Sequence, residues 1–422
     1  MRHSFYSKVI FLCTLIFSKL KITLIFLTYV INTFKYGLSW QASYLNFRIE
    51  TLYNSHCNYR NLKIFLKKYF FISTLKIKKN FNLDFFLNKT EIRSNSFFLK
   101  EIDKLPLHES IAFFKNLLLY FQHFGSLTNC LIVRKYYRKK LIELQSKSSV
   151  ININALKACL EINKPNLVIN FFKFKNYKIF EKKKIFEIYK YALMLKYKKK
   201  IISKKKSFIE SKYYQIIYNK NVIICGPSVN KYKNLKSHLK NNIKISMNSM
   251  GQKKNNQTIS FYNKFRVISA PRKILHAYPK LLFLCFKTNE GINLILSKFK
   301  NINARIFKNA NNVLLNSYGA NLSQNIVYDT LFYNPKKIYL CGISFYLGRK
   351  VYSKNYKINI FTNKEIGISL RIHDPFSNFL FLKNLFKRGL ILASNETSKI
   401  LNLSEIKFAR RLNEKYGHYV VV

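Results

Sequence analysis

Hydrophobic residues recur every three or four positions between roughly residues 107 and 205. The recurring positions form three groups: Ile111, Phe114, Leu117, Leu118 and Phe121; Ala155, Leu156, Cys159 and Leu160; and Ile185, Ile188, Tyr191, Ala192 and Leu195. This spacing places apolar side chains on one face of an α-helix. Breaks at Gly125 and Pro165 fit turns between helices. The region is therefore expected to form helical hairpins stacked beside the next domain, without a repeat signature clear enough to indicate a solenoid.

After Lys220 the pattern changes to short apolar runs that each end at turn-forming residues. The runs are Asn221–Cys225, Ile243–Met247, Thr258–Tyr262 and Lys337–Cys341. Nearly continuous apolar strands that alternate with helical stretches are typical of a parallel sheet with helices on both faces. The predicted fold class is therefore α/β, with a single Rossmann-like, mostly parallel sheet domain at the C-terminus and an α-helical region before it. Ligands of such sheets bind at the carboxyl ends of the strands.

Two lysine-rich runs, Lys198–Lys200 and Lys204–Lys206, separate the helical pattern from the strand pattern. Such a run is typical of a solvated linker, although it could also touch phosphates or lipid. We expect residues 1–40 to be a hydrophobic, basic membrane-associating segment and residues 41–210 to be a mainly α-helical region of unknown role. Residues 211–422 are expected to form the α/β domain.

The N-terminal segment contains two apolar stretches, Val9–Ser18 and Ile22–Phe34, which Lys19 and Lys21 divide. Neither stretch reaches the ~18–20 residues that a membrane-spanning helix needs. For the combined segment, the two lysines cost roughly 5–7 kcal/mol of insertion free energy, and the apolar residues return roughly 5–10 kcal/mol. Spanning and surface binding thus both stay open. We expect attachment to the membrane interface on the cytoplasmic side, helped by flanking basic residues and Trp40.

The chain is strongly basic, with 75 Lys and Arg against 18 Asp and Glu, which gives a formal net charge of +57. Lys, Asn, Ile, Phe and Tyr are enriched together throughout, as AT-rich coding sequences produce whatever the function. Nucleic acid is therefore not expected as a partner, although such a surface attracts phosphates and acidic head groups.

The seven cysteines are scattered, odd in number and contain no Cys-x-x-Cys pair: Cys13, Cys57, Cys130, Cys159, Cys225, Cys285 and Cys341. This pattern supports neither a disulfide framework nor a zinc site. Cys225 and Cys341 end apolar runs, where a cysteine usually acts as a small buried hydrophobic residue.

The tripeptide Gly226-Pro227-Ser228 follows the first apolar run. Exposed N–H groups before a helix suit a phosphate, and Ser228 could cap the helix or donate a hydrogen bond. A plain structural turn is an equally good interpretation. No lysine follows in the position that a P-loop requires, so a nucleoside triphosphatase is not expected.

This turn is the first of an ordered set of motifs in the C-terminal half. The set comprises Cys225–Ser228, Met247-Asn248, Phe261–Asn263, Asn316–Gly319, Ile338–Tyr346, Tyr352 and His373. It resembles the bacterial family-42 sialyltransferases, and the resemblance covers about 200 residues, from about residue 215 to 422. The most specific motif is Ile-Tyr-Leu-Cys-Gly-Ile-Ser-Phe-Tyr, with a second tyrosine six residues on and a histidine about twenty further. Those enzymes use CMP-sialic acid without a metal on one Rossmann-like domain, a GT-A-like variant.

The resemblance implies a role for each matching residue. His373 would be the general base that deprotonates the acceptor hydroxyl, and Tyr346 and Tyr352 would donate hydrogen bonds to the departing CMP phosphate. The nucleotide and sugar pocket would be lined by Gly226, Pro227, Ser228, Asn248, Asn263, Ser317, Gly319 and Gly342. Residues 211–422 would then be the nucleotide-sugar-binding catalytic domain, with a CMP-activated sugar as donor, a glycan or glycolipid of lipopolysaccharide or capsule as acceptor, and neither metal nor cofactor.

The chemistry agrees with these roles, because a histidine can accept a proton near neutral pH and phenols can stabilise a leaving phosphate. The chain departs from the family pattern at Ser344, where aspartate is usual. It also has the additional Tyr318 and has no arginine before the Ser-Gly turn, the nearest being Arg305. The donor sugar thus stays open, as does the alternative of a basic membrane- or nucleic-acid-associated nucleotide-binding protein without transferase activity. His373 could also be a turn histidine held by Asp374.

Overall fold

A computed structural model describes the chain in segments between residues 92 and 416. The described residues are 92–93, 96–123, 126–148, 150–173, 182–197, 207–227, 242–247, 259–262, 282–287, 289, 292–293, 303–315, 320–348, 370 and 374–416. They belong to one compact unit, residues 85–421.

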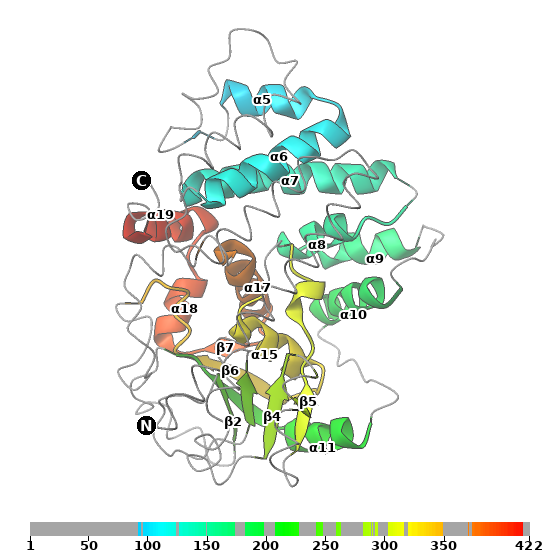
Figure 1. Cartoon of the computed structure of the whole chain (residues 1–422), viewed down its shortest axis with the longest axis vertical. Coiled ribbons are helices and arrows are strands. Elements are labelled where there is room, and N and C mark those ends of the chain that lie inside the picture. The colour runs from blue at the N-terminus through cyan, green and yellow to red at the C-terminus, as the bar shows by residue number, and fades with distance from the viewer. Residues whose placement is uncertain are drawn as a thin grey trace, which may run out of the picture. The chain divides into compact units, whose positions relative to one another are not determined.

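Helices precede the sheet in the described part of the chain. They are α5 (Phe97–Lys104), α6 (Leu107–His123), α7 (Leu127–Lys147), α8 (Ile153–Glu161), α9 (Pro165–Lys173), α10 (Lys182–Tyr197) and α11 (Phe208–Ile217). From α5 to α10 each helix packs on the next, as Figure 1 shows. α7 begins just after Gly125, and Pro165 is the first residue of α9, a position where its missing N–H leaves no partner unsatisfied. The predicted helical hairpins are confirmed.

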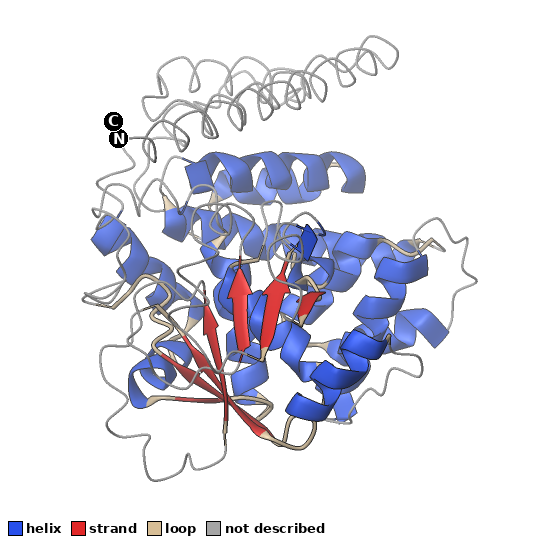
Figure 2. Cartoon of the chain, turned by 60° about the horizontal axis from the view of Figure 1, so that its bottom comes forward, coloured by secondary structure: helices blue, strands red, loops and turns tan. Residues whose placement is uncertain are grey.

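The strands of the described residues form one sheet in which every neighbouring pair is parallel. They are β1 (Asn221–Cys225), β2 (Ile243–Met247), β3 (Ile259–Tyr262), β4 (Phe283–Phe286), β5 (Ala304–Ile306), β6 (Lys337–Cys341) and β7 (Leu392–Ala393). Their order is β5-β4-β3-β2-β1-β6-β7, and they lie side by side as one layer (red in Figure 2). The α/β prediction is confirmed. The predicted runs coincide with β1, β2 and β6, and β3 begins one residue later than expected.

Burial explains why these segments form parallel strands. All four residues of β3 and of β4 are buried, and only the first residue of β1 is partly exposed. A strand covered on both faces reads as a continuous apolar run, because neither face meets water. Cys225 and Cys341 are buried beside Ile223, as the sequence predicts.

Two helices after the first five strands complete the core, α15 (Leu322–Leu331) and α17 (Pro375–Lys387). Every residue of α17 from Pro375 to Leu385 is buried, which identifies it as a central helix rather than an amphipathic surface helix. The Asp374 carboxylate caps its start by accepting hydrogen bonds from the N–H groups of Phe376 and Ser377, each 3.0 Å long.

The last two helices of the described residues are α18 (Asn395–Leu401) and α19 (Glu405–Tyr416). α19 packs against α7, so the last helix contacts the helices that precede the sheet. The ring of Phe408 on α19 stacks on Phe379 of α17 with 3.9 Å between ring centroids. These contacts join helices from both ends of the described chain into one core.

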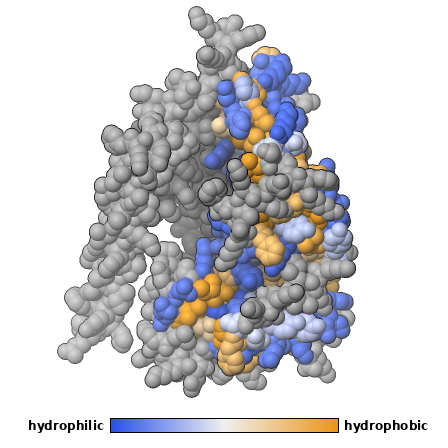
Figure 3. Space-filling model, turned by 90° about the vertical axis from the view of Figure 1, so that its right-hand side faces the viewer, coloured by the Kyte–Doolittle hydropathy of each residue, from blue (hydrophilic) through white to orange (hydrophobic). Residues whose placement is uncertain are grey.

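Hydrophilic and hydrophobic residues are interspersed over the described face shown in Figure 3. Some exposed aromatic rings make cation–π contacts with lysine ammonium groups. Lys190 Nζ lies 4.2 Å from the ring centre of Phe186, and Lys212 Nζ lies 4.5 Å from that of Phe208. Such contacts at exposed positions stabilise by about 0.5–1 kcal/mol each. Part of the large basic charge is thus accommodated by the protein's own aromatic side chains.

None of the helices in the described part of the chain is both long and apolar enough to cross a bilayer. The apolar stretches Val9–Ser18 and Ile22–Phe34 lie outside the described residues, as do both lysine runs. Membrane attachment through residues 1–40 stays a prediction.

Candidate active site at the switch point of the sheet

The strand order reverses between β1 and β6. The chain adds β2 to β5 on one side of β1 and then returns to place β6 on the other side. β1 and β6 end together, because Cys225 pairs with Cys341 in the parallel register. Loops that leave such a switch point diverge, and ligands of open parallel sheets bind in the crevice between them. The fold therefore brings the described residues of two motifs, Cys225–Pro227 and Ile338–Tyr346, to the edge where a ligand is expected.

Residue 226 must be glycine, because there is no space for a side chain at this edge of the sheet. Its N–H donates a 2.7 Å hydrogen bond to the Cys341 carbonyl, so the two chains touch directly after the strands. A Cβ atom at Gly226 would lie 2.2 Å from the Gly342 oxygen, far inside contact distance. Gly342 itself has φ of 65°, a conformation that L side chains adopt rarely. Both glycines thus have a structural reason to be there, and both directly follow the strands β1 and β6.

A strained turn follows Gly342. The Leu347 N–H donates a 2.8 Å bond to the Ser344 carbonyl, and the residues between them, Phe345 and Tyr346, have φ of 48° and 68°. A turn with two positive φ angles normally holds Asn, Asp or Gly. Bulky residues held in such conformations cost about 1–3 kcal/mol each and cluster at functional sites.

Contacts from the C-terminal helices hold this turn. The buried ring of Phe345 packs edge-on against Phe379 and Phe408, with centroid distances of 5.7 and 6.3 Å. The Tyr346 carbonyl accepts hydrogen bonds from Lys415 Nζ at 3.0 Å and from the Tyr416 hydroxyl at 2.6 Å. Residues about 70 positions further along the chain thus fix a backbone that its own sequence disfavours.

The side chain of Tyr346 points to the start of α15. Its hydroxyl oxygen accepts a 3.3 Å hydrogen bond from Asn321 Nδ2. Asn321 is the N-cap residue of α15, yet its side chain bonds Tyr346 and not the first turn of the helix. A helix N-terminus favours negative charge. A phosphate that accepted a hydrogen bond from this phenol would therefore lie where its charge is stabilised. The sequence did not predict a role for Asn321, because its partner Tyr346 is 25 residues away.

Lys415 brings a positive charge to the same loop, since its ammonium also donates a 2.7 Å bond to the Gly348 carbonyl. Burial lowers the pKa of this ammonium below its ordinary value. Cys341 is no nucleophile, because burial, with a smaller contribution from Cys225, raises the pKa of its thiol to about 12.

Several predicted site residues lie outside the described residues: Ser228, Asn248, Asn263, Ser317, Gly319, Tyr352 and His373. In the sequence, Asn248 and Asn263 directly follow the last residues of β2 and β3, and His373 directly precedes the cap of α17. Gly226, Pro227, Gly342 and Tyr346 are described, and they lie on the two segments that leave the switch point. The roles of all eleven stay predictions.

Arg305 does not replace the arginine that is missing before the Ser-Gly turn. Its buried guanidinium donates to Glu210, Asp329 and Tyr333, with Nε 2.8 Å from Glu210 Oε1 and Nη1 2.8 Å from Asp329 Oδ2. It also lies 4.2 Å from the ring centre of Tyr213. Arg305 therefore binds α11, which carries Glu210, and α15, which carries Asp329, to β5.

Asp374 is a structural carboxylate. Oδ1 caps α17, and Oδ2 receives a 2.7 Å bond from Arg134 Nη1. Arg134 follows the apolar residues Cys-Leu-Ile-Val of α7. This apolar run is the sequence feature that indicates that the arginine is buried. Among the described residues, no group of three or more His, Cys, Asp or Glu side chains is placed to hold a metal ion.

Comparisons of the chain with protein-family models, with curated proteins and with solved structures find no match. The resemblance stated above therefore stands on the motif residues themselves.

Proposed function

We propose that the chain is a glycosyltransferase that moves a sialic-acid-like sugar from a CMP-activated donor to a glycan acceptor. The observation that carries this proposal is that Cys225–Pro227 and Ile338–Tyr346, the described residues of two motifs, meet at the switch point of an all-parallel sheet. The proposal includes a Rossmann-like, GT-A-like nucleotide site there, since nucleotides bind such sheets at this place.

The reaction needs two kinds of assistance. The bond between the sugar carbon and the phosphate oxygen breaks, and its electron pair leaves with CMP. The acceptor hydroxyl oxygen forms the new bond to that carbon and gives up its proton. In the proposed site Tyr346 and Tyr352 donate hydrogen bonds to the leaving phosphate, and His373 accepts the proton.

The described geometry supports the part given to Tyr346. Asn321 Nδ2 donates to the phenol oxygen and thereby holds the Tyr346 hydroxyl beside the start of α15. The start of α15 and the ammonium of Lys415 both favour an anion near this turn. The strained backbone at Phe345 and Tyr346 is a further sign of a functional site.

A donor screen tests the reaction and its metal requirement together. Purified full-length protein is incubated with CMP- and UDP-sugars, and free CMP or UDP is measured with and without EDTA. We expect CMP release from a nonulosonic acid donor at the same rate in EDTA, because residues 221–350 contain no Asp-x-Asp to hold a divalent ion on a diphosphate. Activity that EDTA abolishes and manganese restores would contradict this, as would release of UDP alone.

A salt titration separates this proposal from the non-catalytic alternative. Nucleic-acid affinity that falls steeply with log salt, without CMP release from any donor, would favour a basic binding protein. CMP binding is expected to depend only mildly on salt.

Tyr346→Phe is expected to lower kcat for CMP release with little loss of stability. The substitution removes one hydrogen bond to the leaving phosphate, which costs about 2.7–4 kcal/mol, or roughly 10²–10³-fold, by analogy with an oxyanion-hole donor. Tyr328→Phe is the matched control, since the buried Tyr328 hydroxyl has no hydrogen-bond partner among the described residues. Equal kcat values for the two variants, measured by CMP release, would remove Tyr346 from the mechanism.

A further inference from the structure

Two consecutive side chains of α19 hold the Tyr346 carbonyl. It accepts hydrogen bonds from Lys415 Nζ at 3.0 Å and from the Tyr416 hydroxyl at 2.6 Å. Lys415 Nζ also donates to the Gly348 carbonyl at 2.7 Å. An ammonium group has three donors and a phenol has one, so only the lysine of this pair can join the carbonyls on both sides of Leu347. Lys415 therefore fixes the backbone of this segment at two points.

The backbone conformation of Tyr346 decides where its side chain lies. With φ of 68°, its hydroxyl oxygen accepts the 3.3 Å hydrogen bond from Asn321 Nδ2 at the start of α15. At a negative φ, which tyrosine normally adopts, the Cα–Cβ bond would point in another direction and this contact would be lost. The segment Ser344–Leu347 contains no residue type that favours a positive φ. The place of the phenol thus depends on contacts from outside the turn.

The ammonium of Lys415 has no carboxylate partner among the described residues. It contacts the two carbonyls and lies 5.2 Å from the ring centre of Tyr416. The buried guanidinium groups of Arg134 and Arg305, by contrast, each pair with two carboxylates. Burial lowers the pKa of the Lys415 ammonium below its ordinary value, because burial disfavours the charged form. No ion pair therefore accounts for this lysine, and its hydrogen bonds are made with Tyr346 and Gly348.

A residue can position another only if it is itself held in place, and α19 is held against α7 at two points. Asn413 Oδ1 accepts a 3.3 Å hydrogen bond from the Leu127 N–H. Glu405, the first residue of α19, lies with Oε2 3.1 Å from Arg138 Nη2. Lys415 thus belongs to a helix that is anchored near both of its ends.

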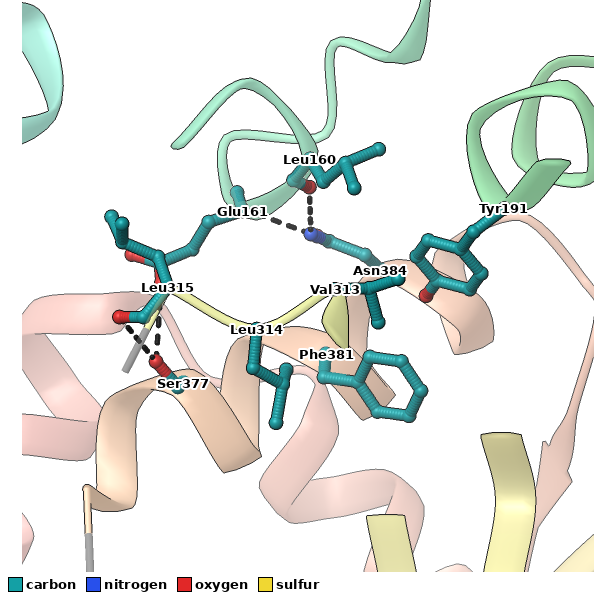
Figure 4. Close-up of a pocket in the computed structure, with 9 residues that line it drawn as sticks. All are labelled: Leu160, Glu161, Tyr191, Val313, Leu314, Leu315, Ser377, Phe381 and Asn384. Carbon is teal, nitrogen blue, oxygen red and sulfur yellow. Dashed lines mark hydrogen bonds between the residues drawn. The ribbon is translucent and has the colours of Figure 1, made fainter. Parts of the chain in front are cut away.

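α17, which packs against the same turn through Phe379 and Phe345, is also held in place. Asn384 of α17 donates hydrogen bonds to the carbonyls of Leu160 and Glu161 on α8 at 3.2 and 2.9 Å (Figure 4). The pocket beside these residues has a volume of about 10 Å³, which is enough for one water molecule at most. The helices that contact the turn are therefore closely packed, and loss of one contact at the turn would move the turn more than the helices.

We propose that Lys415 is a positioning residue of the transferase, which holds the Tyr346 hydroxyl at the start of α15, where the leaving phosphate would bind. This inference rests on the proposed function and gives the C-terminal helix α19 a part in it. Lys415 acts through the Tyr346 carbonyl and touches no reacting atom.

The first test replaces Lys415 in the full-length protein by methionine, which removes every donor, and by arginine, which can still donate to both carbonyls. CMP affinity and the kcat for CMP release are measured per folded molecule, with the folded fraction taken from unfolding curves. We expect kcat of Lys415→Met to fall about 10²-fold, the size of a 1 Å misplacement, with CMP affinity unchanged. Lys415→Arg should stay within about tenfold of the wild type. Lys140→Met is the control with unchanged kcat, because the Lys140 side chain is also buried and its ammonium donates a 2.6 Å bond to the Asp103 carbonyl.

A double-mutant cycle tests whether Lys415 acts through Tyr346. Lys415→Met should lower kcat no further in a protein that already carries Tyr346→Phe, since the hydroxyl that it positions is then absent. Tyr416→Phe covers the case in which Lys415→Met does not fold. It removes one hydrogen bond from the Tyr346 carbonyl and should lower kcat about tenfold, again only where the Tyr346 hydroxyl is present. Tyr328→Phe is its control, as above.

The outcomes separate the two proposals. Suppose that the wild-type protein releases CMP. Equal kcat per folded molecule in each variant and its control would then overturn the role of Lys415, as would effects of Lys415→Met and Tyr346→Phe that multiply in the double mutant. Either result leaves the transferase proposal standing. Absence of CMP release by the wild-type protein from every donor would overturn both proposals.

Discussion

Replacing His373 by alanine is expected to lower kcat by roughly 10²–10⁴-fold, with little change in the affinity for CMP. A general base acts on the acceptor proton in the transition state and contributes little to donor binding. The wild-type rate should rise with pH through the histidine pKa, near 6.5 when unperturbed, because only the neutral imidazole accepts a proton. It should then become flat. The measurement is CMP release with acceptor present, across pH 5 to about 9.

His108→Ala is the control for this substitution, since His108 is exposed on α6. The substitution should lower the rate of donor hydrolysis by water less than the rate of sugar transfer, because the base deprotonates the acceptor hydroxyl. If His373→Ala has a normal kcat and an unchanged pH profile, His373 is not the general base. It is then a turn histidine held by Asp374.

Gly226→Ala is expected to lower both stability and turnover. Its Cβ would meet backbone atoms of Gly342, the oxygen at 2.2 Å and the carbon at 2.6 Å, so β1 and β6 must separate at their carboxyl ends. Overpacking of this kind costs about 1–3 kcal/mol of folding free energy. A displacement of about 1 Å at this edge of the sheet would lower kcat by about 10²-fold beyond the effect on folding. Urea unfolding and CMP release per folded molecule measure the two effects.

Gly389→Ala is the control variant, because it strains the backbone without displacing a neighbouring segment. Gly389 has φ of 68°, and nothing lies within 4 Å of its added Cβ. Its replacement should destabilise by about 1–2 kcal/mol, through the backbone conformation alone, and leave turnover per folded molecule unchanged. If Gly226→Ala behaves in the same way, the close approach of β1 and β6 has no role in the site.

The strands that were predicted share one property. β1, β2 and β6 are apolar runs that stop at Gly or Asn, so the turn residue marks the carboxyl end. β4 is apolar as well, but a short apolar run inside Leu281–Phe286 does not by itself distinguish a strand from a buried helix. β5 has three residues with a buried arginine in the middle, so no apolar pattern marked it.

The sequence correctly placed Gly226 and Gly342 at strand ends, but it did not predict the contacts that shape the turn after Gly342. The segment Ser344–Leu347 holds no Gly, Asn or Asp, so its sequence gives no sign of a turn with two positive φ angles. That conformation is imposed by Phe379, Phe408 and Lys415. The pairing of Arg134 with Asp374 could not be predicted either, since a pairing across 240 residues leaves no local pattern.

The ion pairs that Arg134 makes with Glu161 and Asp374 also bear on when the fold is completed during synthesis. Arg134 and Glu161 are 27 residues apart, so both leave the ribosome early and α7 and α8 can pair them. Asp374 follows Arg134 by 240 residues. Until it emerges, the nascent helices carry a guanidinium with only one of its two carboxylates, and the edge of the sheet has neither α17 nor α19 against it. The edge of the sheet where β1 and β6 end is therefore completed among the last parts of the described chain.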